Sequence, residues 1–234
     1  MNIKQFLFVL FWLVLIIDCY FIANGLYEYR LYSKSLLVPI LLFAIYFGSA
    51  HSKHFKSKLL INLGLLFCFI GDIFLLSQTG ISNFILGLFA FLIALIFFNI
   101  LFLRLTNFRL NKNRNLLAAI VIVVAYLAVF LWILFPHLKF QYMEIPVSIY
   151  AVVMGSFIIT ALNTVKIRKL RNIALYYFVP GSIFFAISDS LLALDRFYSS
   201  FRYAEISVML TYGIALFLLS AGFIRFLGNG ETIG

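Results

Sequence analysis

The chain contains eight long runs of apolar residues, and these runs limit what it can fold into. Each run holds about 20 mostly apolar residues, the length that an α-helix needs to cross the hydrocarbon core of a bilayer. The runs are continuously apolar rather than alternating, which favours helices over the strands of a membrane barrel. We place the spans at about 5–23, 35–50, 59–77, 81–103, 116–136, 145–165, 173–194 and 204–226. The sequence therefore predicts an all-α, polytopic transmembrane helix bundle that forms a single membrane domain over residues 1–234.

The composition excludes the main soluble alternatives. Hydrophobic residues make up 65% of the chain and charged residues 11%, whereas soluble domains contain about 45–50% and about 25%. The same figures exclude a disordered chain. The two cysteines, Cys19 and Cys68, both lie in apolar runs, which indicates buried thiols and not a disulfide framework.

The basic residues are distributed unevenly about the predicted spans. The net charge is +10, but Lys and Arg fall in short clusters between apolar runs, so we expect contact with membrane lipids and none with nucleic acid. Of the 18 basic residues, thirteen lie on the side of the termini, and five lie on the opposite side: Arg30, Lys34, Lys139, Arg196 and Arg202. Cytoplasmic loops carry the excess of Lys and Arg. This split predicts a multi-pass protein of the cell (plasma) membrane with both termini in the cytoplasm.

Acidic residues inside the apolar runs are the candidate functional groups. Asp72 and Asp189 lie about 20 Å and about 24 Å from the inner ends of their spans, at about 1.5 Å per residue, and Asp18 is at a similar height. A carboxylate at the centre of a spanning helix costs about 2.5–3.5 kcal/mol, so it persists when it is paired, hydrated or needed for function. We expect these acids to share one layer in the outer half of the bilayer. For Asp72 and Asp189 we favour function over a structural ion pair with Lys34 or Arg196.

A weak internal repeat relates the two aspartates. Residues 64–72 read Gly-Leu-Leu-Phe-Cys-Phe-Ile-Gly-Asp and residues 181–189 read Gly-Ser-Ile-Phe-Phe-Ala-Ile-Ser-Asp, which agree at four of nine positions with an offset of 117. The two segments lie in the third span of each set of four. A parallel 4+4 repeat would therefore place both carboxyls at equal depth around a shared centre.

These residues resemble the YhhN family of integral membrane proteins, a lysoplasmalogenase-like family. The resemblance rests on Gly71-Asp72 with Leu75-Leu76, on Ser188-Asp189-Ser190-Leu191-Leu192-Ala193 with Arg196-Phe197, and on Lys34, Gly87, Phe91-Leu92, Tyr212 and Ala215. The chain departs from the family pattern at Leu95, Phe98 and Leu216, where the family carries a histidine, an aromatic hydroxyl and a glutamine.

The resemblance implies an intramembrane hydrolase that cleaves the vinyl ether bond of a lysoplasmalogen, a single-chain ether phospholipid, to a fatty aldehyde and a glycerophospho-alcohol. Protonation of a vinyl ether gives an oxocarbenium ion that captures water, and two carboxyls can divide the work around such a cation. The catalytic candidates are Asp72 and Asp189. Because its neighbours are more apolar, we favour Asp72 as the protonated acid.

The candidate substrate-binding residues are Lys34, Arg196, Asp18, Glu205 and Tyr212. Lys34 and Arg196 lie on the outer side, where a phosphate needs a cation. Lys34 and Arg196 could instead be interface residues whose charged ends extend to the lipid headgroups. Glu205 could instead be an acid that stabilises the positive end of the helix dipole at the start of its span. The chain has no nucleotide-binding, serine-nucleophile or zinc motif, so we expect no cofactor and no metal.

Three other interpretations remain open. One is a proton- or cation-coupled membrane transporter that uses the acids as ion sites. Against it, the repeat is parallel and no span is clearly broken at mid-membrane. Another is a diverged family member that lacks catalysis. The last is an intramembrane aspartyl protease, which ranks lowest because residues 69–72 read Phe-Ile-Gly-Asp and lack the first glycine of a G-x-G-D motif.

Overall fold

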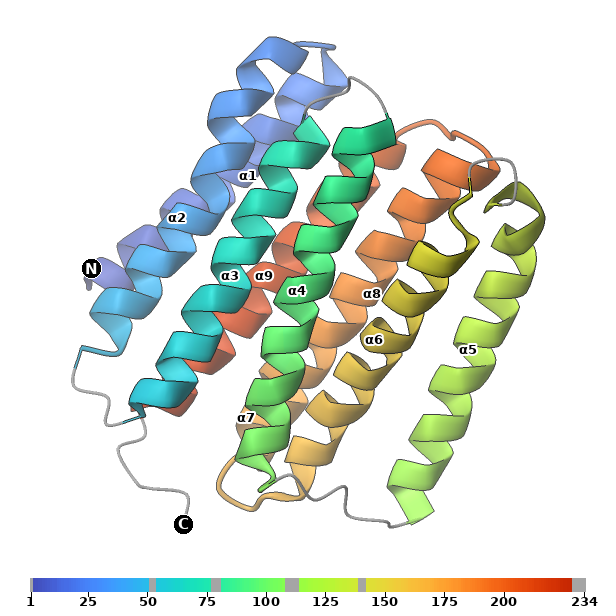
Figure 1. Cartoon of the computed structure of the whole chain (residues 1–234). Helices are drawn as coiled ribbons and strands as arrows, with labels where there is room; N and C mark the ends of the chain where they lie inside the picture. The colour runs from blue at the N-terminus through green and yellow to red at the C-terminus, as the bar shows by residue number, and fades with distance from the viewer. Residues whose placement is uncertain (1, 51–53, 77–80, 108–113, 139–141, 229–234) are drawn as a thin grey trace.

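The computed structural model describes residues 2–50, 54–76, 81–107, 114–138 and 142–228. The described residues form a bundle of long helices and contain no strand (Figure 1). Eight of the helical segments are long and apolar enough to cross a membrane, which confirms the predicted all-α, polytopic architecture. Lys139, which entered the comparison of basic residues, lies outside the described ranges.

The helices follow one another along the chain with short connections. They are α1 (Ile3–Ala23), α2 (Arg30–Gly48), α3 (Phe55–Leu76), α4 (Ile81–Leu105), α5 (Arg114–Leu138), α6 (Glu144–Asn163), the short α7 (Arg171–Ile173), α8 (Val179–Ala193) and α9 (Ala204–Gly228). Two π-helical turns flank α8, η4 (Ala174–Phe178) and η5 (Leu194–Tyr198), so that α7 to η5 make one continuous span. Turns of this kind recur at functional sites.

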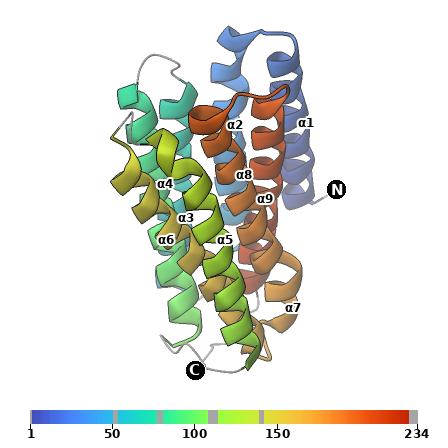
Figure 2. The same cartoon turned by 90° about the vertical axis from the view of Figure 1, so that its right-hand side faces the viewer.

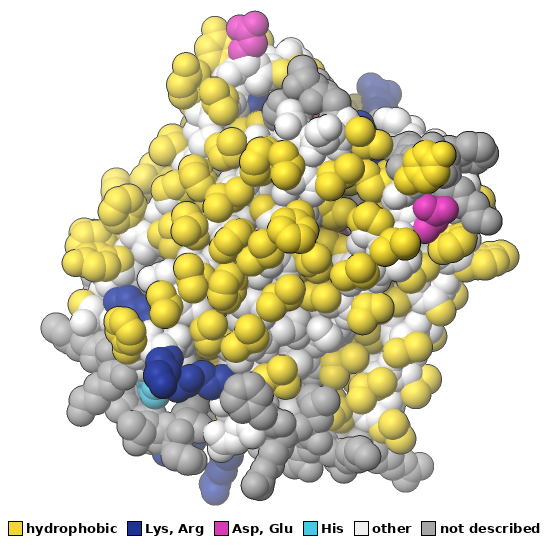
Figure 3. All heavy atoms as spheres, in the orientation of Figure 1, with side chains coloured by type: hydrophobic (Ala, Val, Ile, Leu, Met, Phe, Trp, Pro, Cys, Tyr) yellow, Lys and Arg dark blue, Asp and Glu magenta, His cyan; other side chains and the backbone are white. Residues whose placement is uncertain are grey.

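The two ends of the bundle differ in what they hold. A Cβ atom at Gly48, where α2 ends, would meet the side chains of Ile224 near the end of α9 and of Lys4 near the start of α1. We call this the terminal end, and the opposite end, where α1 leads into α2 and α8 into α9, the distal end (Figures 1 and 2). Figure 3 shows apolar side chains across the middle of one face, with most of the Lys and Arg side chains near its lower edge.

Helix α2 is longer than the apolar run predicts. It begins at Arg30, directly after a 3-10 turn, and not near residue 35. Arg30 and Lys34 therefore belong to the helix and are 8% and 7% exposed. Their charges pair with carboxylates of neighbouring helices. This pairing offsets the free-energy cost of placing a charged side chain in a membrane span, which a hydropathy profile counts as if the charge were isolated. Arg196, expected in a loop, likewise lies in the π-helical η5.

Contacts between helices support the internal repeat. A Cβ atom at Gly71 of α3 would lie 2.6 Å from the ring of Phe91 on α4. Ser188 on α8 and Val208 on α9 lie 117 residues after Gly71 and Phe91, respectively. These two residues are also in contact, because the hydroxyl of Ser188 donates a hydrogen bond of 3.1 Å to the carbonyl oxygen of Val208. Helix α3 therefore packs on α4 in the same register that α8 uses on α9.

Glycine allows α3 to approach α4 closely at a second level. A Cβ atom at Gly64 would lie 2.4 Å from the ring of Phe98. Phe98 is fully buried, and its ring lies 5.9 Å from that of Phe157 and 5.7 Å from that of Phe223. Because these neighbours hold the Phe98 ring in place, the added methyl group has no space.

We predict that Gly64→Ala destabilises the bundle by about 1–3 kcal/mol, the usual cost of overpacking a well-packed core. Thermal unfolding in detergent micelles would measure the effect. Gly228→Ala is the matched control, because a Cβ atom at the end of α9 meets nothing within 4 Å. Equal unfolding temperatures for the two variants would contradict the prediction.

Candidate functional site

Arg30 joins three helices at the distal end. Its guanidinium donates a hydrogen bond of 2.6 Å to the carboxylate of Glu205 on α9 and lies 3.6 Å from the carboxylate of Asp18 on α1. Asp18 is fully buried and also accepts a hydrogen bond of 2.6 Å from the hydroxyl of Ser33. The expected substrate-binding acids Asp18 and Glu205 are thus both charge partners of Arg30.

Lys34 lies one helical turn beyond Arg30, on the same face of α2. Its ammonium nitrogen is 3.4 Å from Oδ1 of Asp72, and the hydroxyl of Tyr212 on α9 donates a hydrogen bond of 2.9 Å to Oδ2 of the same carboxyl. Asp72 is 1% exposed. Its two oxygens therefore face one cation and one hydroxyl donor, and both of these contacts stabilise the ionised form of a carboxyl.

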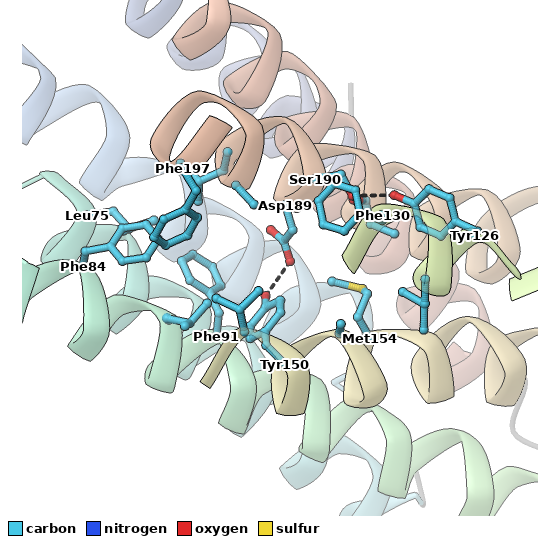
Figure 4. A pocket seen from close by; sticks show the side chains of 17 residues that line it. Leu75, Phe84, Phe91, Tyr126, Phe130, Tyr150, Met154, Asp189, Ser190 and Phe197 are labelled. Carbon is cyan, nitrogen blue, oxygen red and sulfur yellow. Dashed lines mark hydrogen bonds between the residues drawn. The ribbon is translucent and has the colours of Figure 1, made fainter. Parts of the chain in front are cut away.

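Asp189 of α8 has a different set of partners. The hydroxyl of Tyr150 on α6 donates a hydrogen bond of 2.5 Å to Oδ2 of Asp189 (Figure 4). Within the described part of the chain, no cation lies within 4.0 Å of this carboxyl. The next residue, Ser190, shares a hydrogen bond of 2.5 Å with the hydroxyl of Tyr126 on α5.

A polar cavity of about 370 Å³ opens at the distal end. Its charged lining residues are Arg30, Lys34, Asp195, Arg196 and Glu205. Three cations and two carboxylates therefore face one space, which suits a charged headgroup that carries a phosphate. We call this space the distal cavity.

An apolar pocket of about 60 Å³ adjoins the distal cavity (Figure 4). Leu75, Phe84 and Leu192 line both spaces, which shows that the two are neighbours. Two hydrogen-bonded polar pairs, Asp189 with Tyr150 and Ser190 with Tyr126, interrupt this otherwise largely hydrophobic lining. We call this space the lateral pocket, because residues of the outlying helix α5 form one of its walls.

The two aspartates are linked through packed aromatic rings, but only Asp189 lines one of these two cavities. The ring of Tyr212, the donor to Asp72, packs edge-on at 5.8 Å against both Phe91 and Phe185. Phe91 in turn lines the lateral pocket together with Asp189. Asp72 itself is not among the residues that line either cavity. Asp189 is therefore the carboxyl that a ligand in the lateral pocket can touch.

The structure places the sequence-predicted site residues in two groups. Lys34, Arg196 and Glu205 line the distal cavity, where the guanidinium of Arg196 lies 5.3 Å from the centre of the Phe84 ring. Asp18 and Tyr212 are instead buried partners of other site residues.

Sequence reasoning missed Arg30 and Tyr150. Arg30 was hidden because the second span was expected to start five residues after it, although its spacing of four from Lys34 places both on one helix face. Tyr150 was hidden because a tyrosine near the end of a span is typical of the membrane interface. Its spacing of 116 residues from Lys34, close to the repeat offset, was the signal that could have identified it.

Comparison with known proteins gives a family and distant relatives. The model of the YhhN family matches residues 29–223. Proteins named lysoplasmalogenase from Mycobacterium bovis and Mycobacterium tuberculosis are each 29% identical to the chain over 140 residues. The match covers 60% of this chain and 51% of each relative, so the matched stretch spans about half the length of these curated proteins. No solved structure matches the chain.

We predict that Arg30→Met destabilises the protein by about 3–5 kcal/mol, because it leaves the buried carboxylate of Asp18 without its cation. A second substitution, Asp18→Asn, should restore much of the loss by removing that charge. Thermal unfolding in detergent measures both variants. Arg202→Met, which removes an exposed cation in the turn before α9, is the control, and an equal loss in Arg202→Met and Arg30→Met would refute the assignment.

Proposed function

Since the chain belongs to the YhhN family, we propose that it is a lysoplasmalogenase-like hydrolase that acts within the membrane. The substrate is a single-chain ether phospholipid, whose vinyl ether bond is cleaved to a fatty aldehyde and a glycerophospho-alcohol. The name of the mycobacterial relatives supports this activity. The observation that carries the proposal is the pair of adjoining cavities, one charged and one apolar, with Asp189 in the apolar one.

The shape of a lysolipid matches this pair of cavities. The phosphate lies in the distal cavity, where Lys34 and Arg196 supply the cations. The hydrocarbon chain leaves through the lateral pocket, whose 60 Å³ accommodates only its first carbons, and continues into the surrounding lipid. The vinyl ether joins head and chain, so it comes to rest beside Leu192, one helical turn from Asp189.

Asp189 is the proposed acid. Its protonated carboxyl transfers a proton to the β carbon of the vinyl ether, and the electron pair of the double bond forms the new C–H bond. The resulting oxocarbenium ion captures a water molecule from the distal cavity. The Asp189 carboxylate takes the proton that this water releases, which restores the acid. The hemiacetal then collapses to aldehyde and alcohol, so the net reaction consumes one water.

Asp72 is the proposed stabiliser of this cation. The Lys34 ammonium and the Tyr212 hydroxyl hold Asp72 as a carboxylate, and a fixed negative charge favours a positive charge that develops nearby in an apolar region. Asp72 also holds Lys34, which lines the distal cavity, in place. The sequence favoured Asp72 as the proton donor. The surroundings of the two carboxyls favour the opposite assignment, with Asp189 as the proton donor and Asp72 as the carboxylate.

We further propose that the terminal end faces the cytoplasm and that the site opens on the other side of the membrane. The excess of Lys and Arg at the terminal end supports this orientation. A lysolipid then reaches the distal cavity from the outer leaflet of the plasma membrane.

Purified protein in detergent should release aldehyde from a lysoplasmalogen, as mass spectrometry of the products would show. Asp189→Asn should lower the rate by a factor of about 10²–10⁴, the usual contribution of a positioned acid. Asp72→Asn should cause a smaller loss, because Asp72 does not touch the substrate.

Glu28→Gln removes an exposed acid outside the site and should leave the rate unchanged. The absence of aldehyde from folded wild-type protein would overturn the proposed function. A larger loss in Asp72→Asn than in Asp189→Asn would overturn the assigned roles.

A further inference from the structure

Lys34 and Tyr150 occupy matching places in the two halves of the chain. Lys34 lies on α2, the span before α3, and contacts Asp72 on α3, while Tyr150 lies on α6, the span before the one that contains α8, and contacts Asp189 on α8. The two residues are 116 positions apart, against 117 for the aspartates. The extra residue falls in the segment that contains the π-helical turn η4, and a π turn takes up about one more residue than an α turn.

The matching places hold chemically different donors. The half with Asp72 supplies an ammonium group from Lys34 and a hydroxyl from Tyr212. The half with Asp189 supplies the hydroxyl of Tyr150, and the position 117 residues before Tyr212 is Leu95, which is fully buried. The repeat therefore gives Asp72 a cation and a second donor, and gives Asp189 one neutral donor.

Among the residues that the structure describes, the other helices around Asp189 place no cation within 4.0 Å of its carboxyl. Helix α4 presents Phe84, Leu88 and Phe91 to the lateral pocket, and α3 presents Leu75 there. On α5, the hydroxyl of Tyr126 is bound to Ser190.

The remaining titratable groups nearby have other partners or positions. On α9, Tyr212 donates to Asp72, and on α3, Cys68 is a buried thiol one turn before Asp72. In η5, Asp195 and Arg196 line the distal cavity, where Arg196 lies over the Phe84 ring.

We propose that Tyr150 is a positioning residue that orients Asp189, the proton-carrying member of the pair, without supplying the charge that would balance an ionised carboxyl. A neutral hydroxyl fixes the orientation of the carboxyl by one hydrogen bond but brings no charge to balance a carboxylate. In apolar surroundings an unbalanced carboxylate is costly, so Asp189 retains its proton. The role of this proton in catalysis rests on the proposed function, but the protonation state can be measured without any substrate.

Infrared spectroscopy of the full-length protein in nanodiscs tests the protonation state directly. A protonated carboxyl gives a C=O stretching band that a carboxylate lacks. We expect wild-type protein at pH 7 to show such a band that is lost in Asp189→Asn. Tyr150→Phe should keep the band but shift its frequency, because the hydrogen bond from the hydroxyl is gone. A wild-type spectrum with no band that depends on Asp189 would overturn the inference.

Exchange of the repeat-related donor is the decisive variant. Tyr150→Lys gives Asp189 an ammonium partner like the one that Lys34 gives Asp72. The added cation favours the ionised carboxyl, so the C=O band of protonated Asp189 should disappear at pH 7. The kcat for lysoplasmalogen should fall about a hundredfold with KM little changed, and it should recover as the pH is lowered and Asp189 regains its proton. A pH profile that does not change in Tyr150→Lys would show that the reaction does not use the proton on Asp189, and it would count against the inference.

Two outcomes separate this inference from the proposed function. One outcome is a C=O band that is lost in Asp189→Asn and shifted in Tyr150→Phe, in a protein that releases no aldehyde. This outcome supports the inference and refutes the proposed function. Aldehyde release by a protein whose Asp189 band is absent refutes the inference and leaves the function standing. If Tyr150→Lys does not fold, the wild-type, Asp189→Asn and Tyr150→Phe spectra still decide the question.

Discussion

Charge compensation by helix α2 is the constraint on which the distal half of the bundle depends. Arg30 and Lys34 are buried one turn apart, and carboxylates from α1, α3 and α9 meet them. A buried charge without its partner is strongly unfavourable, whereas a paired and hydrogen-bonded one is tolerated. The two cations therefore fix the positions of three neighbouring helices, and they do so where the polar cavity opens. The proposed recognition of the headgroup would therefore use the same side chains as the structural pairing.

The two halves of the chain have similar packing but different chemistry. Gly71 against Phe91 and Ser188 against Val208 show one register in both halves. The polar residues that contact the aspartates differ, so the pair can divide its labour as glycosidase carboxyls do, with one ionised and one protonated. In glycosidases the environment of each carboxyl sets this asymmetry, and in the proposal made here the ammonium on α2 and the hydroxyl on α6 provide the two environments.

The sequence predicted the fold well because the information is in the hydropathy. Eight apolar runs are enough to give eight spanning helices, and no packing detail is needed. The start of α2 could not be predicted in this way, because Arg30 and Lys34 are tolerated only through partners distant in sequence. The same limit applied to the site: Asp72 and Asp189 stood out as charges in apolar runs, whereas Tyr150 is an ordinary residue for its place. Long-range pairing is the information that hydropathy lacks.

The departures from the family pattern place apolar side chains in the core of the bundle at α4. Leu95 and Phe98 are fully buried on α4, and Phe98 packs in an aromatic cluster with Phe157 and Phe223. Both positions form apolar core contacts in this chain, and the next polar side chain on α4, Asn99, is hydrogen-bonded to Thr160 and Val153 on α6. In the proposed reaction the water comes from the distal cavity, which borders the lateral pocket at Leu192. In the proposed reaction Asp189 acts as both donor and acceptor of the proton, which agrees with the apolar side chains of Leu95 and Phe98 at α4.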